Sequence, residues 1–268
     1  MIWEKKDAAI VINELVFSWP EAELPLFENL NLRFRKGETT CLIGPNGSGK
    51  TSLIELMLGW RRASSGYIGV GGQSITAMPS RERGRMMALV PQEERIPFSY
   101  SVLEYVMLGR APYLSPLASP GRDDRDWAIR SLDKVGIRHL SRRLVPSLSG
   151  GEKRMTLIAR ALVQNPQIMF LDEPINHLDP ANSERIIEIL IGLRTSGITV
   201  IMSSHDPDLV FRVADKVVML RSGEAPMMGS PSKLLSSKRL SELYGVGARV
   251  VDVEDRKFIL WGKCQDSG

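Results

Sequence analysis

A glycine-rich stretch at residues 42 to 56, LIGPNGSGKTSLIEL, constrains the fold of this chain more than any other feature. Gly44, Gly49, Lys50 and Thr51 match the pattern G-x-x-x-x-G-K-[ST]. A short apolar run precedes the pattern and a helical pattern follows it, which is the context in which such a stretch forms a phosphate-binding loop. The stretch therefore predicts a strand, a phosphate loop and a helix in direct succession.

The residue types in this stretch suit a dense negative charge. Glycines have no Cβ, so backbone N–H groups are able to curve around a phosphate chain. The N-terminus of the following helix adds a partial positive charge. We expect Lys50 to reach the β- and γ-phosphates and the Thr51 hydroxyl to hold Mg²⁺. The alternative is a glycine-rich strand-to-helix turn without a ligand. The loop residues expected to bind a nucleotide are Gly44, Pro45, Asn46, Gly47, Ser48, Gly49, Lys50, Thr51 and Ser52.

The strand patterns change character along the chain. In NLNLRFRKGE, Leu30, Leu32 and Phe34 alternate with polar residues up to Gly37, which predicts an antiparallel sheet in the first forty residues. From Cys41 onward, the runs TCLIG, QIMFLDEP, GITVIMSS and KVVMLRSG are typical of buried strands in a mostly parallel sheet. The expected fold class is α/β: a P-loop NTPase core with a mostly parallel sheet, an N-terminal antiparallel β subdomain and an inserted helical subdomain.

The insertion begins near Glu93 and is helical and loop-like as far as Leu148. Ser101 and Glu104 form a capping-box pattern, and Ala128, Leu132 and Val135 share one face of a second predicted helix that ends at Gly136. The C-terminal stretch ARVVDVEDRKFILWG predicts two strands around a charged turn. We expect a single domain over residues 1–268, with the helical subdomain at about 93–160 and a C-terminal extension at about 225–268.

Composition excludes several classes of protein. Hydrophobic residues make up 43% of the 268 and charged residues 25%, which argues against a disordered or membrane-embedded chain. No apolar run is long enough to span a bilayer, and the first residues lack a signal-peptide core, so a cytoplasmic protein is expected. Cys41 and Cys264 give neither metal spacing nor a disulfide framework. The net charge of +4 fits a solvated surface or a negatively charged partner.

An acid pair ends one of the predicted buried strands. In QIMFLDEP, Asp172 and Glu173 stand where a carboxylate pair is costly unless it serves a metal or a reaction. We expect Asp172 to hold Mg²⁺ through water and Glu173 to act as the general base on an attacking water. The alternative is a strand end that reaches solvent. Together with the phosphate loop, the pair indicates hydrolysis of a nucleotide.

A third motif precedes that strand. SLSGGEKRMTLIARAL contains LSGGE at residues 148–152 and strongly resembles the signature of ATP-binding cassette (ABC) ATPases. Ser149 is a natural N-cap, and the helix behind it presents its dipole to an anion. The resemblance implies that two cassettes pair head to tail, so that the signature of one closes on the ATP of the other. The signature residues are Ser149, Gly150, Gly151 and Glu152, of which Glu152 replaces the commoner glutamine.

The resemblance also assigns roles to isolated residues. It implies that Trp19 in FSWP stacks on adenine, that Gln92 in LVPQ touches Mg²⁺ and the water, and that His205 in SSHDP contacts the γ-phosphate. Asp179 in NHLDP corresponds to a turn at the dimer interface. A core tryptophan, a capping or core histidine and a helix-capping aspartate are the alternatives. The implied cofactors are ATP and Mg²⁺, with the metal held by Thr51, Gln92 and Asp172, and the implied catalytic residues are Glu173, His205 and Gln92.

The resemblance runs from about residue 10 to 252 and narrows to one group of transporters. PFSYSVLEYVMLGRAPYL and LLSSKRLSELYGVGARVV are similar to ATPases that import metal chelates (iron siderophore, haem or cobalamin), with molybdate-type importers close behind. The implied partners are a second copy of the chain, two transmembrane permease subunits and, indirectly, an extracytoplasmic binding protein, at the cytoplasmic face of the membrane. No nucleic acid is expected, because the chain has no sustained heptads and no basic block. A soluble ABC ATPase of DNA repair or translation, a regulator without turnover and an exporter are the alternatives.

Overall fold

The computed structural model describes residues 7–96, 98–254 and 256–262. Contacts within the chain divide it into two compact units. The first unit comprises Met1–Ala77 and Ile201–Gly268, and the second comprises Met78–Val200. The first unit therefore contains the phosphate loop, and the second contains the acid pair and the LSGGE motif.

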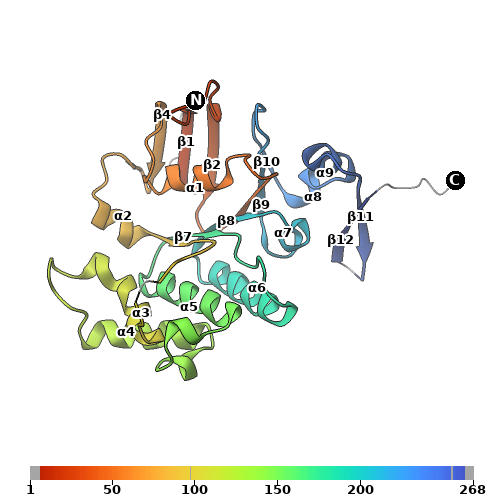
Figure 1. The fold of residues 1–268 in the computed structure, drawn as a ribbon. Helices are drawn as coiled ribbons and strands as arrows, with labels where there is room; N and C mark the ends of the chain where they lie inside the picture. The colour runs from red at the N-terminus through yellow and green to blue at the C-terminus, as the bar shows by residue number, and fades with distance from the viewer. Residues whose placement is uncertain (1–6, 97, 255, 263–268) are drawn as a thin grey trace. The chain divides into compact units, whose positions relative to one another are not determined.

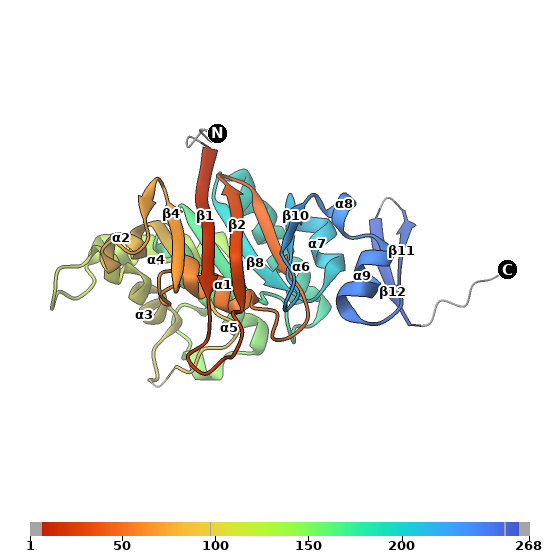
Figure 2. The same cartoon turned by 90° about the horizontal axis from the view of Figure 1, so that it is seen from above.

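An antiparallel sheet opens the first unit. Its strands are β1 (Ala8–Phe17), β2 (Phe27–Arg35), β4 (Ser65–Val70) and β5 (Gln73–Ser74), in the order β2-β1-β4-β5. Figures 1 and 2 show β2, β1 and β4 side by side. In β2 the side chains of Leu30, Leu32 and Phe34 are buried and their neighbours are mostly exposed. The predicted alternating strand is confirmed. The sequence pattern did not place β4 in this sheet, because β4 returns to it only after a helix.

The phosphate loop follows a buried parallel strand of the first unit. Strand β3 (Thr39–Ile43) is buried throughout and pairs in parallel with β9 (Lys216–Met219), which carries β10 (Met227–Gly229) antiparallel on its other edge. In the strand order β3 is also next to β8 (Thr199–Ser204), whose first two residues belong to the second unit. Helix α1 (Lys50–Met57) comes directly after the loop, as predicted.

The C-terminal part of the first unit is a small helical and hairpin layer. After α7 (Pro207–Val213) and α8 (Pro231–Leu234), helix α9 (Ser237–Tyr244) packs against β11 (Ala248–Val253), and α7 packs against β12 (Arg256–Trp261). The Ile259 N–H donates to Asp208 Oδ1 at 3.0 Å, which ties the hairpin to α7. The predicted pair of strands around a charged turn is confirmed.

The second unit combines parallel strands with most of the helices. Strand β6 (Met87–Val90) pairs in parallel with β7 (Ile168–Asp172), and β8 follows β7 in the strand order. The α-helices of the unit are α2 (Ser80–Met86), α3 (Val102–Met107), α4 (Arg122–Lys134), α5 (Gly150–Val163) and α6 (Pro180–Thr195). Short 3₁₀ helices are η2 (Leu108–Tyr113), η3 (Arg138–Leu140) and η4 (Val145–Ser147). Both α3 and α4 pack against α5.

Two helix predictions in this unit are confirmed. Ser101 N donates to Glu104 Oε2 at 2.8 Å and Glu104 N donates to Ser101 Oγ at 3.3 Å, which completes the capping box of α3. In α4, Ala128 and Leu132 are fully buried, as expected from their shared face. The α/β fold class with an antiparallel β subdomain and a helical insertion is thus observed.

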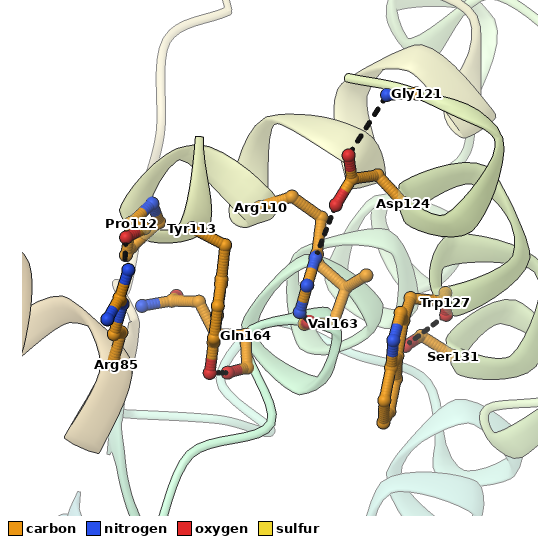
Figure 3. A network of polar contacts seen from close by, with 10 residues as sticks. All are labelled: Arg85, Arg110, Pro112, Tyr113, Gly121, Asp124, Trp127, Ser131, Val163 and Gln164. Atoms are coloured by element: carbon orange, nitrogen blue, oxygen red, sulfur yellow. Dashed lines mark hydrogen bonds and ion pairs between the residues drawn. The ribbon is translucent and has the colours of Figure 1, made fainter. Parts of the chain in front are cut away.

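A polar network closes the C-terminal end of α5 (Figure 3). Arg110 of η2 donates through Nη1 to Val163 O at 3.1 Å and through Nε to Asp124 Oδ1 of α4 at 2.9 Å. The ring of Tyr113 lies 3.9 Å from the Arg110 guanidinium, and its hydroxyl donates to Gln164 O at 2.8 Å. Carbonyls at a helix end have no partner within the helix. Here the carbonyls of Val163 and Gln164 accept from side chains of η2, which therefore joins α4 to α5.

The described residues contain no membrane-spanning helix and include one of the two cysteines. Among residues 7–96, 98–254 and 256–262, no helix combines the length and apolar character needed to cross a bilayer. Cys41 lies fully buried in β3. Cys264 lies outside the described residues.

The buried ion pair of Arg110 generates a stability prediction. The side chains of Arg110 and Asp124 are 11% and 13% exposed, so Arg110→Met leaves a largely buried carboxylate without its partner. We expect a loss of about 3 kcal/mol in the free energy of unfolding, measured by urea titration at pH 7. The matched control is Arg138→Met, whose pair with Asp133 has side chains 62% and 47% exposed; we expect a loss below about 1 kcal/mol there.

The same pair predicts a pH dependence. The hydrogen bond from Arg110 holds the pKa of the Asp124 carboxyl below its usual value. Its contribution to stability is therefore present above the unfolded-state pKa of about 3.9 and is lost as pH falls through the lower folded-state pKa. The difference between the parent and Arg110→Met should shrink in that acidic range; a difference that stays constant with pH contradicts this assignment.

Candidate functional site

The phosphate loop positions its lysine through two backbone carbonyls. Gly49 is the N-cap of α1 with φ 96°, and Lys50 is the first helical residue. Lys50 Nζ donates to Gly44 O at 2.7 Å and to Pro45 O at 3.1 Å, so the side chain folds back along the loop. Both acceptors belong to the loop itself, so the ammonium group lies within the segment that the motif assigns to phosphate. The structure thus gives Lys50 the placement that the motif predicts.

Gly44 and Ser48 explain why the loop has its composition. A Cβ at Gly44 would lie 2.2 Å from Leu220 O and 2.6 Å from Ser48 Oγ, so no larger residue fits without movement of the backbone. Among the described residues, the buried Ser48 Oγ has no hydrogen-bond partner. Buried hydroxyls are normally hydrogen-bonded. A phosphate oxygen would satisfy this one, which supports the anion-binding assignment of the loop.

Two further predicted residues of the first unit lie at its surface. Trp19 is 39% exposed, with its ring edge-on to Phe17 and the Arg61 guanidinium 4.1 Å from the ring centroid. The alternative of a core tryptophan is therefore wrong. His205 is exposed directly after β8, and the cap of α7 is Asp206 instead. Neither a core nor a capping role describes His205.

The acid pair of the second unit is buried and its backbone is strained. Asp172 ends β7, and Asp172 and Glu173 are each 8% exposed, so the alternative of a strand end in solvent is wrong. Glu173 has φ 49°, a left-handed conformation that costs a residue with a Cβ roughly 1–2 kcal/mol. Such strain persists only where the surrounding structure enforces it, and it clusters at functional sites. This outlier marks Glu173 as a residue whose placement is under constraint.

The LSGGE motif forms the N-terminus of α5, as predicted. Ser149 is the N-cap: its Oγ accepts from Glu152 N at 3.3 Å, and Glu152 Oε2 accepts from Ser149 N at 2.8 Å. The hydrogen bond from the Ser149 N–H, with smaller contributions from its hydroxyl and from the charge of Arg143, lowers the pKa of Glu152. Glu152 in place of glutamine therefore completes a capping box, while Ser149 and Gly150 stay exposed.

The signature also contacts the turn that contains Asp179. A Cβ at Gly151 would lie 2.3 Å from the amide group of Asn182, so a larger residue here requires that side chain to move. Asn182 donates from its backbone N to Asp179 Oδ1 at 2.9 Å and from Nδ2 to Oδ2 at 2.6 Å. Asp179 is the N-cap of α6, as the alternative reading of this residue expected. Its place at a dimer interface remains a prediction.

Sequence reasoning missed one residue next to Gln92. Gln92 is exposed after β6, and its carbonyl accepts from the buried guanidinium of Arg154 in α5 at 2.8 Å. Arg154 lies three residues after Gly151 and four before Ile158, on the buried face of the helix. A charged residue at a core position of an amphipathic pattern is the signal by which it is recognisable.

The chemistry of the expected metal ligands fits Mg²⁺. Thr51, Gln92 and Asp172 offer a hydroxyl, an amide and one carboxylate, all oxygen donors of the kind that a hard cation prefers. The described ranges hold no cluster of three or more His, Cys, Asp or Glu side chains able to bind a metal. A cation that keeps several waters and binds the substrate's phosphates needs no such cluster.

Comparison with known proteins identifies the family. The family described as "ABC transporter" matches residues 27–176, which is more than half of the chain and contains both the phosphate loop and the LSGGE motif. The chain belongs to the ABC transporter family. As an ABC ATPase it binds nucleotide and hydrolyses ATP.

Relatives in this family include import proteins for different cargo. The molybdate import ATP-binding protein MolC of Haemophilus influenzae is 35% identical over 237 residues, 88% of each chain. The hemin import ATP-binding protein HmuV of Photobacterium damsela subsp. piscicida is 34% identical over 231 residues, 84% of this chain and 86% of the relative. A solved structure of a metal-chelate type ABC transporter in an inward-facing conformation superimposes with a TM-score of 0.84 at 30% identity, covering 95% of this chain and 97% of the other.

The phosphate loop and the LSGGE motif are expected to contribute differently to ATP binding. Lys50→Ala removes the cation that the loop positions, and we expect the affinity of the monomer for ATP to fall about 10- to 100-fold, the effect of losing hydrogen bonds from a charged donor. The matched variant is Ser149→Asn, which keeps an N-cap acceptor but removes the hydroxyl. We expect it to leave monomer affinity within twofold and to weaken ATP-driven dimerisation. Titration calorimetry and gel filtration distinguish the two; an equal loss of monomer affinity in both variants contradicts the separate roles.

Proposed function

We propose that this chain is the ATP-hydrolysing subunit of an ABC importer that takes up a metal chelate, either an iron siderophore, haem or cobalamin. The observation that supports the proposal most is the likeness over nearly the whole of both chains to a metal-chelate type ABC transporter. The import ATPases MolC and HmuV add support for import over export.

The first step is nucleotide binding by the phosphate loop. Lys50 and the loop N–H groups neutralise the β- and γ-phosphates, and the Ser48 hydroxyl gains the acceptor that it lacks among the described residues. Trp19 stacks on adenine with its exposed ring. Thr51, Gln92 and Asp172 would hold Mg²⁺, which supplies positive charge to the phosphate oxygens when bound.

The second step is the activation of water. Glu173, buried and fixed in a left-handed conformation, takes the proton of the attacking water as general base. Gln92 orients that water, and His205 donates to the γ-phosphate as its charge changes in the transition state. The strained backbone at Glu173 favours this role, because it fixes the direction in which the side chain leaves the main chain.

The third step needs a second copy of the chain. The exposed Ser149 and Gly150 begin a helix of 14 residues, whose N-terminus attracts an anion. We propose that this end closes on the ATP held by the second copy, with Asp179 at the interface, to form a homodimer. Two permease subunits in the membrane and an extracytoplasmic binding protein complete the transporter, and the chain lies peripherally at the cytoplasmic face.

The cargo has one specific alternative. MolC, at 35% identity, favours molybdate or a related oxyanion. The ATPase has no contact with cargo in this scheme, so uptake has to be measured with the complete transporter. A soluble ABC ATPase acting on nucleic acid remains the alternative outside transport, and it makes different predictions about partners.

Removal of the general base tests the chemistry. Glu173→Gln keeps the size of the side chain but accepts no proton, so we expect ATP hydrolysis to fall roughly 100- to 10,000-fold while ATP binding is retained. ATP-bound dimers should then accumulate on gel filtration. Glu188→Gln, at an exposed position of α6, is the matched control and should hydrolyse at the parent rate. Near-parent turnover of the Glu173 variant would move the base elsewhere.

Partner binding tests the importer assignment. We expect the chain to co-purify with a polytopic membrane protein, and substitutions at the exposed Glu93 and Arg95 and at the half-buried Tyr100 to weaken this association without loss of ATP affinity. Reconstituted vesicles should take up one of the three metal chelates in an ATP-dependent way. Uptake of molybdate alone would select the alternative cargo. ATPase activity that DNA or ribosomes stimulate, with a steep salt dependence and no membrane partner, would overturn the importer assignment.

A further inference from the structure

Arg154 joins the helix of the LSGGE motif to the loop after β6. Its Nη1 donates to Pro91 O at 2.7 Å and its Nη2 donates to Gln92 O at 2.8 Å. Both acceptors are consecutive main-chain carbonyls, which the planar fork of a guanidinium reaches with two donors at once. The arginine therefore holds the backbone of Gln92, not its side chain. The Gln92 amide stays available for the role proposed above.

The burial of this arginine is costly and needs a reason. Arg154 is 7% exposed, and burial lowers the pKa of its guanidinium, whereas the charges of Asp172, Glu173 and Glu93 act in the opposite direction. A buried charge is seldom more stabilising than an apolar side chain of similar volume. Stability of α5 alone therefore does not account for an arginine here. An apolar residue at this position would leave the carbonyls of Pro91 and Gln92 without the two hydrogen bonds that Arg154 donates.

A second arginine of α5 holds the same loop. Arg160 donates from Nη1 and Nη2 to the two carboxylate oxygens of Glu94 at 2.5 and 2.6 Å, and its guanidinium lies 4.9 Å from the ring of Tyr105. A bidentate pair of this kind fixes orientation as well as distance. Residues 91–94 are thus bound to α5 at two points that lie almost two helical turns apart.

The other end of β6 is bound to α5 as well. Gln164, just past the helix, donates from Nε2 to Gly84 O at 2.6 Å and to Met87 O at 3.2 Å, and Met87 is the first residue of β6. This contact lies at the end of the helix away from Ser149. It provides a tether of the same helix to the same strand that does not touch the loop of Gln92.

We propose that Arg154 is a positioning residue that binds the Gln92 backbone to the signature helix, so that Ser149 and Gln92 move as one body. The proposal rests on the proposed function, since it assigns Ser149 to the ATP of a second copy and Gln92 to the water and Mg²⁺. When the signature of one copy closes on the ATP held by the second copy, it also sets the position of Gln92 at the ATP of its own copy. Hydrolysis at each site therefore requires that both signatures have closed.

The test compares loss of the two tethers. Arg154→Gln is too short to reach either carbonyl and Arg154→Lys offers one donor group in place of the fork, whereas Gln164→Met cuts the distant tether. For Arg154→Gln we expect kcat for ATP to fall about 10- to 100-fold, the effect of two lost charge-assisted hydrogen bonds, with ATP affinity of the monomer and ATP-driven dimerisation within twofold of the parent. Arg154→Lys should recover part of the loss, and Gln164→Met should keep kcat within twofold.

Two further measurements keep the outcome clear. Glu94→Gln weakens the Arg160 tether at a partly exposed position, so it folds even where an Arg154 variant does not; we expect its kcat to fall several-fold with unchanged ATP affinity. Hydrogen exchange of segment 91–96 in the full chain, which excludes the Gln164 acceptor Met87, should rise in the Arg154 and Glu94 variants but not in Gln164→Met. Unchanged exchange in that segment, or an equal fall of kcat in Gln164→Met, overturns the proposal. A parent chain without ATPase activity contradicts the proposed function instead, and the exchange result still decides the role of Arg154.

Discussion

The packing of α5 against β6 is the contact on which the second unit depends. This helix begins with the LSGGE motif, and its side chains hold β6 at both ends, through Gln164 at Met87 and through Arg154 after the strand. Helices α3 and α4 are in turn packed on α5, and η2 satisfies its last carbonyls. A single helix thus connects the inserted helices, the loop of Gln92 and the N-cap Ser149 of the LSGGE motif. Hydrogen bonds to backbone carbonyls make that connection rigid, because they leave little freedom of rotation at either end.

The phosphate loop depends on a different constraint, the absence of side chains where the backbone is crowded. Gly44 lies against Leu220 O, and a Cβ there would overlap it. The crowding therefore disfavours any side chain at this position of the loop. Lys50 is held by two carbonyls of the same loop. An anion that enters meets donors already in place, which lowers the entropy that binding has to overcome.

Much of the site was predictable because its chemistry is local in sequence. The phosphate loop, the capping box of Ser149 and Glu152, and the N-cap position of Asp179 each involve residues within a few positions of one another. Trp19 and His205 were assigned through the resemblance to ABC ATPases, and the acid pair through its place at the end of a buried strand. The structure removed their alternatives by showing which side chains are exposed and which are buried. Arg154 was missed, since its partners Pro91 and Gln92 are more than sixty residues away along the chain.

The sequence by itself determined the family of this protein and the strand-loop-helix unit that forms the phosphate loop. It also determined the periodicity of the main strands and helices. Turn chemistry, capping and apolar periodicity are properties of short segments, so they can be read without knowing what the segments pack against. Only the tertiary structure decided that β4 joins β1, that Glu173 is strained, and that Arg154 binds the Gln92 backbone. Those facts depend on which distant segments meet, and loop closure over such separations leaves no periodic trace in the sequence.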